Sequence, residues 1–314
     1  MNYKVALASL LLVTAAVAYA DPEPCNLAVV SRELPAKTKV CDSQTVAALA
    51  RQGHVYEQNQ LGLAAMLVVG PNVDLKTAAE WFQKSAEHGY APAQVNLAVL
   101  YVNGWGVSRN YAAAQLWLRR AADAHYAPAY FNLGQLYFKG IGVRQDYAEA
   151  LRFFQLGVDA GDSYSQTNLA YIYDRGLGVA QDVNAAVRWY SKAADAGNAM
   201  AQSNLADLYS HGEGVTRDEA MAFRLFQKAA EQGHTGAQIQ VAYRLAEGVG
   251  TSKDPRAALT WVTAAVSSGD NRGQELLHTL QLQLKPSEIK RSQQVAADLR
   301  QKSATTAKAA LFQP

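Results

Sequence analysis

Short polar side chains that could ligate a metal recur at a fixed spacing along this chain. Carboxylates bind Ca²⁺ or Mg²⁺ only where several of them converge on one point. Residues one period apart in a repetitive chain lie in successive structural units, so they do not converge, and the sequence predicts no metal site. The recurring residues are Asp74, Asn110, Asp146, Asp182, Asp218 and Asp254, each 36 residues after the last.

Other residue patterns that carry catalysis are missing. The sequence contains no Gly-x-Ser-x-Gly, no His-Glu-x-x-His and no phosphate-binding Gly-Lys-Ser/Thr. The six histidines form no constellation, and His88, His125 and His234 fall near predicted helix ends, where a capping or exposed role is expected. The sequence therefore predicts a protein that is not an enzyme and needs no cofactor.

The first residues are typical of a secretory signal peptide. Lys4 precedes an apolar run from Val5 to Val17, and Ala18-Tyr19-Ala20 forms a cleavage site of the Ala-x-Ala type. We expect export to the periplasm and cleavage after Ala20. The run is too short for a membrane-spanning helix, and we expect no transmembrane segment elsewhere.

Two cysteines, Cys25 and Cys41, lie between the cleavage site and the repeats. An exported chain meets an oxidising compartment, so we expect them to form a disulfide within an N-terminal cap over residues 21–54. In the chain-entropy model a loop of this size contributes about 3 kcal/mol. The alternative is two separate buried thiols.

Glycine pairs in the pattern Gly-x-Gly return every 36 residues and define the architecture. A period of this length predicts a solenoid of stacked helical hairpins, in which each unit buries its apolar face only against its neighbours. Aligning the chain at this period gives six units over residues 55–270. The pairs are Gly104 and Gly106, Gly140 and Gly142, Gly176 and Gly178, Gly212 and Gly214, and Gly248 and Gly250.

Each unit reads as two helices. The Gly-x-Gly turn ends the first helix, because glycine accepts a positive φ at a helix C-terminus. The recurring Asp or Asn then caps the second helix, where its oxygen accepts backbone N–H bonds. Glycine ends most second helices as well, but His125 takes its place in one unit, so we expect strain or a different cap there.

The second helices carry a column of alanines and a column of large side chains. We expect the alanines to let helix backbones approach and the large rings to fill the space between hairpins. The large column comprises Trp81, Trp117, Phe153, Trp189, Leu225 and Trp261.

These columns resemble the Sel1-like repeat family. The fourth unit shows the pattern in full, with Leu169, Tyr173, Gly176-Leu177-Gly178-Val179, Asp182, Ala186, Trp189-Tyr190, Lys192-Ala193-Ala194 and Gly197. The resemblance covers about residues 55–270. It implies an all-α, right-handed α-solenoid of about six helix-turn-helix repeats, related to tetratricopeptide arrays and used as a scaffold for protein partners. Residues 271–314 would form the C-terminal cap and tail.

Residues that vary between units indicate where a partner binds. At 100° per residue, one stripe of the first helices lies opposite the predicted core, and by analogy with tetratricopeptide arrays it lines the concave side. Along the chain, the side chains of this stripe change from apolar to polar and acidic. This change suits a partner segment with an apolar anchor followed by basic residues. Alternatively, half of the apolar members only pack between units. The stripe comprises Val95, Val99, Val102, Phe131, Gln135, Phe138, Tyr171, Asp174, Asp207 and Tyr243.

Trp105 occupies the variable site inside the first Gly-x-Gly turn, where other units carry Ile141, Leu177, Glu213 and Val249. A ring on a turn is expected to be partly exposed, so Trp105 is either a contact residue or a local packing residue.

The charge balance argues against nucleic acid as the partner. The chain has 29 Lys and Arg against 27 Asp and Glu, spread along the helices rather than clustered. Our first functional hypothesis is a periplasmic adaptor that binds an envelope or secretion protein on its concave face. The second is an immunity protein that neutralises a cognate secreted toxin, and the third is an envelope enzyme or glycan binder.

Overall fold

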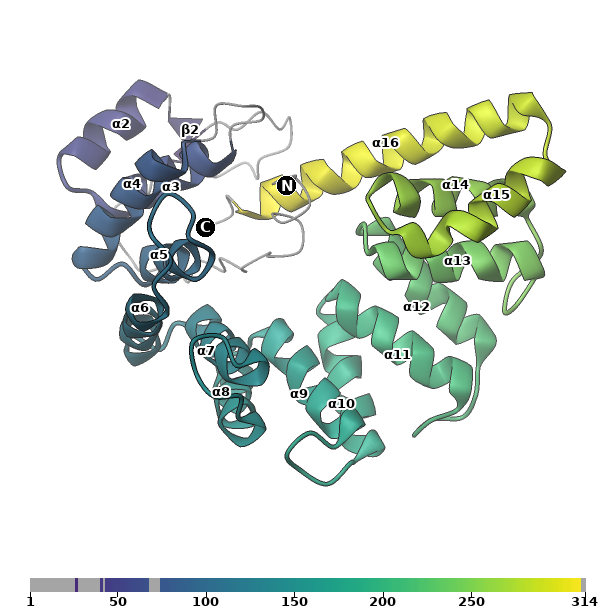
Figure 1. Ribbon diagram of the computed structural model, residues 1–314, viewed down its shortest axis with the longest axis horizontal. Coiled ribbons are helices and arrows are strands. Elements are labelled where there is room, and N and C mark those ends of the chain that lie inside the picture. Colours follow the sequence, from purple (N-terminus) through teal and green to yellow (C-terminus); the bar gives the residue numbers. More distant parts are fainter. Residues whose placement is uncertain (1–25, 28–39, 42, 68–73, 312–314) are drawn as a thin grey trace. The chain divides into compact units, whose positions relative to one another are not determined.

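The computed structural model describes residues 26–27, 40–41, 43–67 and 74–311, and it divides into two compact units (Figure 1). The N-terminal unit holds the described residues up to Ser165, and the C-terminal unit comprises Gln166–Ala307. The division falls inside helix α9. The predicted signal peptide over residues 1–20, Cys25 and the Cys41 side chain lie outside the described residues, so the predicted cleavage and disulfide lie outside them as well.

Six helical hairpins account for most of both units, which confirms the predicted helical repeats. The first helices are α3 (Val55–Leu67), α5 (Ala91–Asn103), α7 (Ala127–Lys139), α9 (Ser163–Arg175), α11 (Ala199–His211) and α13 (Thr235–Glu247). The second helices are α4 (Leu75–Glu87), α6 (Tyr111–Asp123), α8 (Tyr147–Asp159), α10 (Val183–Asp195), α12 (Glu219–Glu231) and α14 (Pro255–Ser267).

Terminal elements flank the hairpins. Strands β1 (Asn26–Leu27) and β2 (Val40–Cys41) pair in parallel, with Asn26 opposite Val40 and Leu27 opposite Cys41. Helix α2 (Ser43–Arg51) packs on α3. After α14 come the 3₁₀ turn η1 (Asn271–Gly273), α15 (Gln274–Gln283) and α16 (Pro286–Leu311).

Each second helix begins at the polar residue that the sequence predicts as its cap. Asp74 accepts the N–H of Thr77 at 2.9 Å, and Asp218 accepts that of Met221 at 2.8 Å. These bonds satisfy amides that the first turn of a helix leaves without partners. The recurring acids are therefore helix caps.

The second glycine of the Gly-x-Gly turn lies against the preceding hairpin at Gly106, Gly142, Gly214 and Gly250. Gly106 has φ +68, and a Cβ there would collide with the backbone of Leu75 at the start of α4. Gly250 meets Glu219 at the start of α12 in the same way. A side chain at either glycine would strain its backbone and force adjacent repeats apart.

A glutamine that sequence reasoning overlooked also joins successive hairpins. Gln94 donates from Nε2 to the carbonyl of Ala86 at 3.1 Å, and Gln238 donates to Ala230 at 3.1 Å. Each bond satisfies a carbonyl near the end of the preceding second helix. Gln58 makes the same bond to Ala50 of α2, so α2 takes the place of a second helix in the N-terminal cap.

The most buried large side chains stand one residue after the predicted aromatic column. Phe82, Phe154, Tyr190 and Phe226 are at most 1% exposed, whereas Trp189 is only half-buried. A glycine of the first helix faces two of these rings, because a Cβ at Gly62 would strike the ring of Phe82 and a Cβ at Gly134 would strike the ring of Phe154. Several rings of the aromatic column have a cation over the ring face. The Lys192 ammonium, for example, lies 4.5 Å from the Trp189 ring centre.

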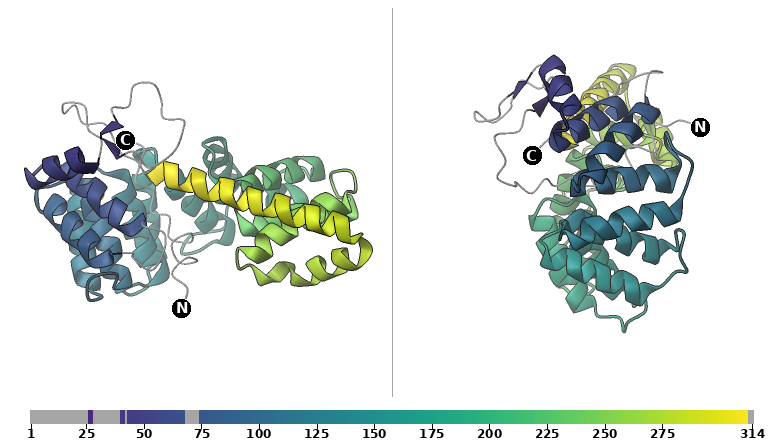
Figure 2. Two further views of the ribbon diagram at one scale, coloured as in Figure 1. Left: turned by 90° about the horizontal axis from the view of Figure 1, so that it is seen from above. Right: turned by 90° about the vertical axis from the view of Figure 1, so that its left-hand side faces the viewer.

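Helix α16 packs along the C-terminal unit through small side chains. Ser292 and Ala296 are buried, and the Ser292 and Ser303 hydroxyls each donate to a carbonyl, of Arg256 and Glu231 respectively, at 3.2 Å (Figures 1 and 2). Val295 of the same helix is 42% exposed because the buried face runs through Ser292 and Ala296.

His125 adopts a left-handed conformation, with φ +55, and is the only non-glycine residue with positive φ in the described part of the chain. Its Nδ1 lies 3.2 Å from the Tyr130 hydroxyl, which in turn donates to the Ala122 carbonyl at 3.0 Å. Tyr130 therefore replaces the glutamine of the other repeats. The different cap expected at this position is present.

We expect His125→Gly to stabilise the protein by about 1 kcal/mol, because a residue with a Cβ is strained at positive φ. Tyr130 keeps its bond to Ala122 in this variant. Denaturant unfolding of the full chain measures the change. Gly161→His is the matched control, since Gly161 has φ +83 and no atom lies within 4 Å of an added Cβ. A loss of stability in His125→Gly would contradict the strain.

His234 caps α13, because its Nδ1 accepts the Ala237 N–H at 3.1 Å and must be unprotonated to do so. Burial, and to a lesser degree the Arg272 guanidinium, lower the pKa of His234 below its usual 6.5, while Asp270 opposes the shift. A lowered folded-state pKa means that the unfolded chain binds the proton more tightly. The stability that this cap contributes is therefore present above pH 6.5 and is lost as the pH falls below it.

We expect His234→Asn to remove this part of the pH dependence, since Asn198 caps α11 in the same manner, accepting from Ala201 at 3.0 Å. The measurement is the difference in melting temperature between wild type and variant from pH 7.5 to 5. The wild type should lose more stability than the variant as the pH falls. Parallel curves would show that His234 does not titrate in this range.

Candidate functional site

The surface of the first helices is the candidate site, and its side chains are best compared by repeat position. Position 1 is the first residue of each first helix, such as Ala91 or Ala199. The predicted stripe occupies positions 5, 9 and 12.

In the N-terminal unit, part of the predicted stripe belongs to the core. Val95 is 0% exposed and Val99 is 7% exposed, so neither offers a surface to a partner, and their assignment as contact residues is corrected. Position 5 and its neighbours turn toward the adjacent hairpin, because a helix in a stack is contacted on both flanks as well as beneath. This outcome matches the alternative that apolar members pack between repeats.

Phe131 and Phe138 are half-buried and share one buried neighbour. Their ring centres lie 6.2 and 6.3 Å from that of Phe154, which is 0% exposed. Phe131 also meets Tyr164 at 5.8 Å, and Phe138 meets Tyr147 at 5.5 Å. Both rings therefore contribute to packing and leave only part of their surface to a partner.

Val102 and Trp105 are half-buried and pack against the core of the N-terminal unit. Trp105 thus has the packing role that the sequence left open, with part of its ring at the surface. Gln135, at position 9, is half-buried as well.

In the C-terminal unit, position 9 lies at the surface. Tyr171 is 38% exposed, Tyr243 is 57% exposed, and Asp207 of the intervening repeat is half-buried. Asp174, at position 12, differs from them because it is only 5% exposed and pairs with Arg175 at 3.2 Å. The exposed face of these helices is therefore centred on position 9.

Sequence reasoning missed the exposed residues at position 13. Arg175, His211 and Glu247 occupy it in the C-terminal unit, and all three are exposed. Position 13 follows position 9 by one helical turn, so it shares that face, whereas position 12 turns toward the neighbouring helix. The sequence did contain a signal for these residues, because position 13 carries a charged or ionisable side chain in three successive repeats.

The carboxyls on this face are partly desolvated. Burial raises the pKa of Asp207, and the nearby Asp174 carboxylate raises it further, while His211, Arg244 and Arg175 lower it. Burial likewise raises the pKa of Asp174 against the opposing effect of Arg175. These electrostatic interactions show that Asp207 of α11 lies near charged side chains of two other helices. Asp174 and Arg175 belong to α9, and Arg244 belongs to α13.

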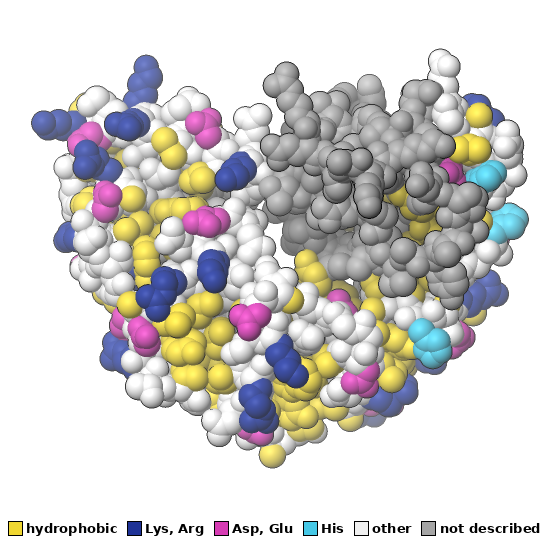
Figure 3. Space-filling model, turned by 180° about the vertical axis from the view of Figure 1, so that it is seen from behind, with side chains coloured by type: hydrophobic (Ala, Val, Ile, Leu, Met, Phe, Trp, Pro, Cys, Tyr) yellow, Lys and Arg dark blue, Asp and Glu magenta, His cyan; other side chains and the backbone are white. Residues whose placement is uncertain are grey.

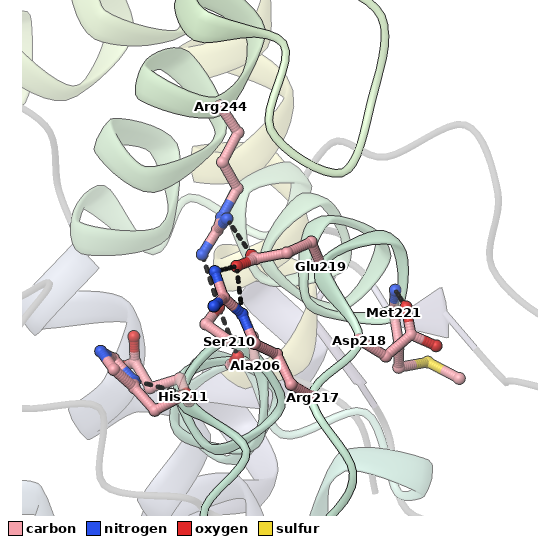
Figure 4. Close-up of polar contacts among 9 residues, drawn as sticks. Ala206, Ser210, His211, Arg217, Asp218, Glu219, Met221 and Arg244 are labelled. Atoms are coloured by element: carbon pink, nitrogen blue, oxygen red, sulfur yellow. Dashed lines mark hydrogen bonds and ion pairs between the residues drawn. The ribbon is translucent and has the colours of Figure 1, made fainter.

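A buried arginine links three helices beneath this surface. Arg244 of α13 donates from Nη1 to Glu219 Oε2 of α12 at 2.8 Å and from Nη2 to Ser210 Oγ of α11 at 2.5 Å (Figure 4). Its side chain is 9% exposed and its guanidinium lies 4.9 Å from the Phe226 ring centre. Arg217 holds the same Glu219 from the solvent side at 2.6 Å.

This ion pair stands where other repeats have apolar residues. Arg244 occupies position 10, the place of Leu100, Leu136, Ile172 and Leu208. Glu219 begins its second helix, the place of Leu75, Tyr111, Tyr147 and Val183. Sequence reasoning did not notice either substitution, although both break an apolar column.

The surroundings contain little else that could act chemically. Among the described residues, no three His, Cys, Asp or Glu side chains are grouped to hold a metal ion. Within the same part of the chain, no helix combines the length and hydrophobicity needed to span a bilayer. Lys and Arg are interspersed with Asp and Glu over the described residues that Figure 3 draws in colour.

Stacked hairpins with a conserved packing scheme and a variable exposed face define a helical-repeat scaffold for protein–protein interaction. The Sel1 repeat pattern matches residues 58–90, 91–126, 127–162, 163–198, 199–234 and 235–270. The chain belongs to the Sel1 repeat family. No functionally curated protein matches it.

Solved structures similar to this chain include Sel1 repeat proteins. A Sel1 repeat protein from Oxalobacter formigenes is 29% identical, with 71% of this chain and 95% of that chain covered, at a TM-score of 0.61. A protective antigen of uropathogenic Escherichia coli with an SLR fold is 27% identical, with 85% of this chain and 65% of that chain covered, at a TM-score of 0.47. An immunity protein from Pseudomonas aeruginosa is 17% identical, with 81% of this chain and 82% of that chain covered, at a TM-score of 0.50. This likeness concerns the fold alone.

We expect a double-mutant cycle to show that Arg244 and Glu219 depend on each other. Glu219→Val leaves the buried guanidinium without its carboxylate and should cost about 3 kcal/mol. Arg244→Leu with Glu219→Val restores the pair that Leu208 and Val183 form by position, and should unfold near the wild-type free energy. Urea unfolding of the four proteins measures the coupling. Additive losses would show that the two side chains contribute independently.

Proposed function

We propose that this protein is a periplasmic adaptor that binds a protein partner through the exposed face of its first helices, chiefly in the C-terminal unit. The family supports a role in protein binding. The observation that carries the proposal is the contrast between positions. Apart from the Arg244–Glu219 pair, the core columns keep their apolar character from repeat to repeat, whereas position 9 changes from buried Val99 to exposed Tyr171 and Tyr243.

Exposed tyrosines are the chemical basis of this choice. Tyrosine is enriched at protein interfaces because its rigid ring provides contact area at a small cost in conformational entropy. Large apolar side chains are costly to expose without a use, and two of them at one repeat position favour a binding surface over chance.

The proposed location follows from the amino-terminal sequence. Lys4, the apolar run and Ala18-Tyr19-Ala20 support export and cleavage after Ala20. In that compartment, the partner would be an envelope or secretion protein. An immunity protein against a secreted toxin remains the second interpretation, because a rigid scaffold suits one tight complex equally well.

Site-specific cross-linking tests the proposal. A photoreactive phenylalanine analogue replaces Tyr243 in the full-length chain, which is expressed, exported and irradiated in cells, and cross-linked proteins are identified by mass spectrometry. We expect one major protein. Its identity as an envelope component or a toxin separates the two interpretations.

The matched control places the same analogue at Leu282, which is 76% exposed on α15 and lies outside the candidate face. We expect the Tyr243 product to be missing there. The same set of products at both positions, or none at Tyr243, would contradict a binding face on the first helices.

A further inference from the structure

One row of the candidate face combines two exposed aromatic rings with a carboxylate. Tyr171, Asp207 and Tyr243 occupy position 9 of α9, α11 and α13. Packed helices lie about 10 Å apart, so equivalent positions of successive first helices form a row along the surface. Asp207 is the middle member, with a tyrosine on either side.

Asp207 differs from the neighbouring Asp174 and Glu219, because its side chain has no hydrogen-bond or ion-pair partner among the described residues. Among the described residues, no hydrogen bond or ion pair reaches its side chain, and only its backbone carbonyl is engaged, by His211 Nδ1 at 2.8 Å. Asp174 pairs with Arg175, and Glu219 pairs with Arg244 and Arg217. A half-buried carboxylate without a partner has lost hydration that nothing replaces.

The nearby arginines are already engaged. Arg244 bonds to Glu219 and Ser210, and Arg175 bonds to Asp174. His211 and these arginines together lower the pKa of Asp207 less than its burial raises it, so they only partly offset the desolvation of the carboxylate. A further donor or cation at this carboxylate would therefore be stabilising.

The rings suit a cation as well. Aromatic faces attract guanidinium and ammonium groups within about 6 Å of the ring centre. Arg175 lies 5.8 Å from the Tyr171 ring centre, which shows that one member of the row already accepts a guanidinium. Tyr243 is the more exposed of the two rings.

We propose that the Tyr171–Asp207–Tyr243 row binds an arginine side chain of the partner, with the guanidinium donating to Asp207 and packing against the Tyr243 ring. Arginine fits better than lysine, because its planar fork can form two bonds to one carboxylate while its flat face lies on an aromatic ring. This inference rests on the proposed function and specifies the chemistry that the partner presents.

A direct binding measurement tests it without knowledge of the partner. 3-Fluorotyrosine replaces Tyr243 in the mature chain Asp21–Pro314, and N-acetyl-arginine amide is titrated at millimolar concentrations while the ¹⁹F resonance is followed. We expect a saturable shift. N-acetyl-citrulline amide has the same shape without the charge. N-acetyl-lysine amide has the charge but lacks the planar guanidinium with its two parallel N–H donors. Both should therefore bind at least tenfold more weakly than N-acetyl-arginine amide.

Two variants carrying the same label complete the design. Asp207→Asn should weaken binding of the arginine probe at least tenfold, whereas Asp195→Asn, at an exposed acid on α10, should leave it unchanged. Circular dichroism melting confirms that both variants fold. Equal responses to arginine and citrulline, or an unchanged affinity in Asp207→Asn, would overturn the inference.

The outcome is independent of the cross-linking result. A partner cross-linked at Tyr243 together with no response to the arginine probe would overturn this inference and leave the proposed function standing. A specific arginine response without a cross-linked protein would support the cation site and argue against the proposed adaptor function.

Discussion

The close approach of the second turn glycine to the preceding hairpin is the constraint on which the rest of the structure depends. Gly106 lies against the backbone at the start of α4, and Gly250 lies against the start of α12. Because no side chain fits at either glycine, the two hairpins that meet there do so at one distance and one register. The capping acids, the glutamine bonds and the buried rings can then recur at identical positions.

The buried ion pair occupies this same junction. The Glu219 backbone faces Gly250, while its side chain reaches Arg244 of the following repeat. Elsewhere an apolar pair fills these positions, and apolar contacts tolerate small rotations. A guanidinium bonded to both Glu219 and Ser210 requires a defined geometry from three helices, which orients α13 relative to α11, the helix that carries Asp207.

Surface and core obey different rules in these repeats. Most core positions hold residues of similar character from unit to unit, because volume must be conserved for packing. Position 9 of the C-terminal unit lies at the surface, so its side-chain volume is not fixed by core packing. Its residues there are Tyr171, Asp207 and Tyr243. The link from structure to function therefore runs through the positions that the packing scheme leaves unconstrained.

The period, the helix boundaries, the caps and the family were readable from the sequence alone, because glycine, aspartate and alanine at fixed spacing express local backbone and capping requirements. Even the unusual end at His125 was visible as a missing glycine. Which members of a surface stripe are exposed was decided only by tertiary structure. Helices in a stack are contacted on their flanks, so Val95 and Val99 became core while Arg175 and His211 came to the surface. The pairing of Arg244 with Glu219 likewise joins residues 25 positions apart, and only the packed hairpins bring them together.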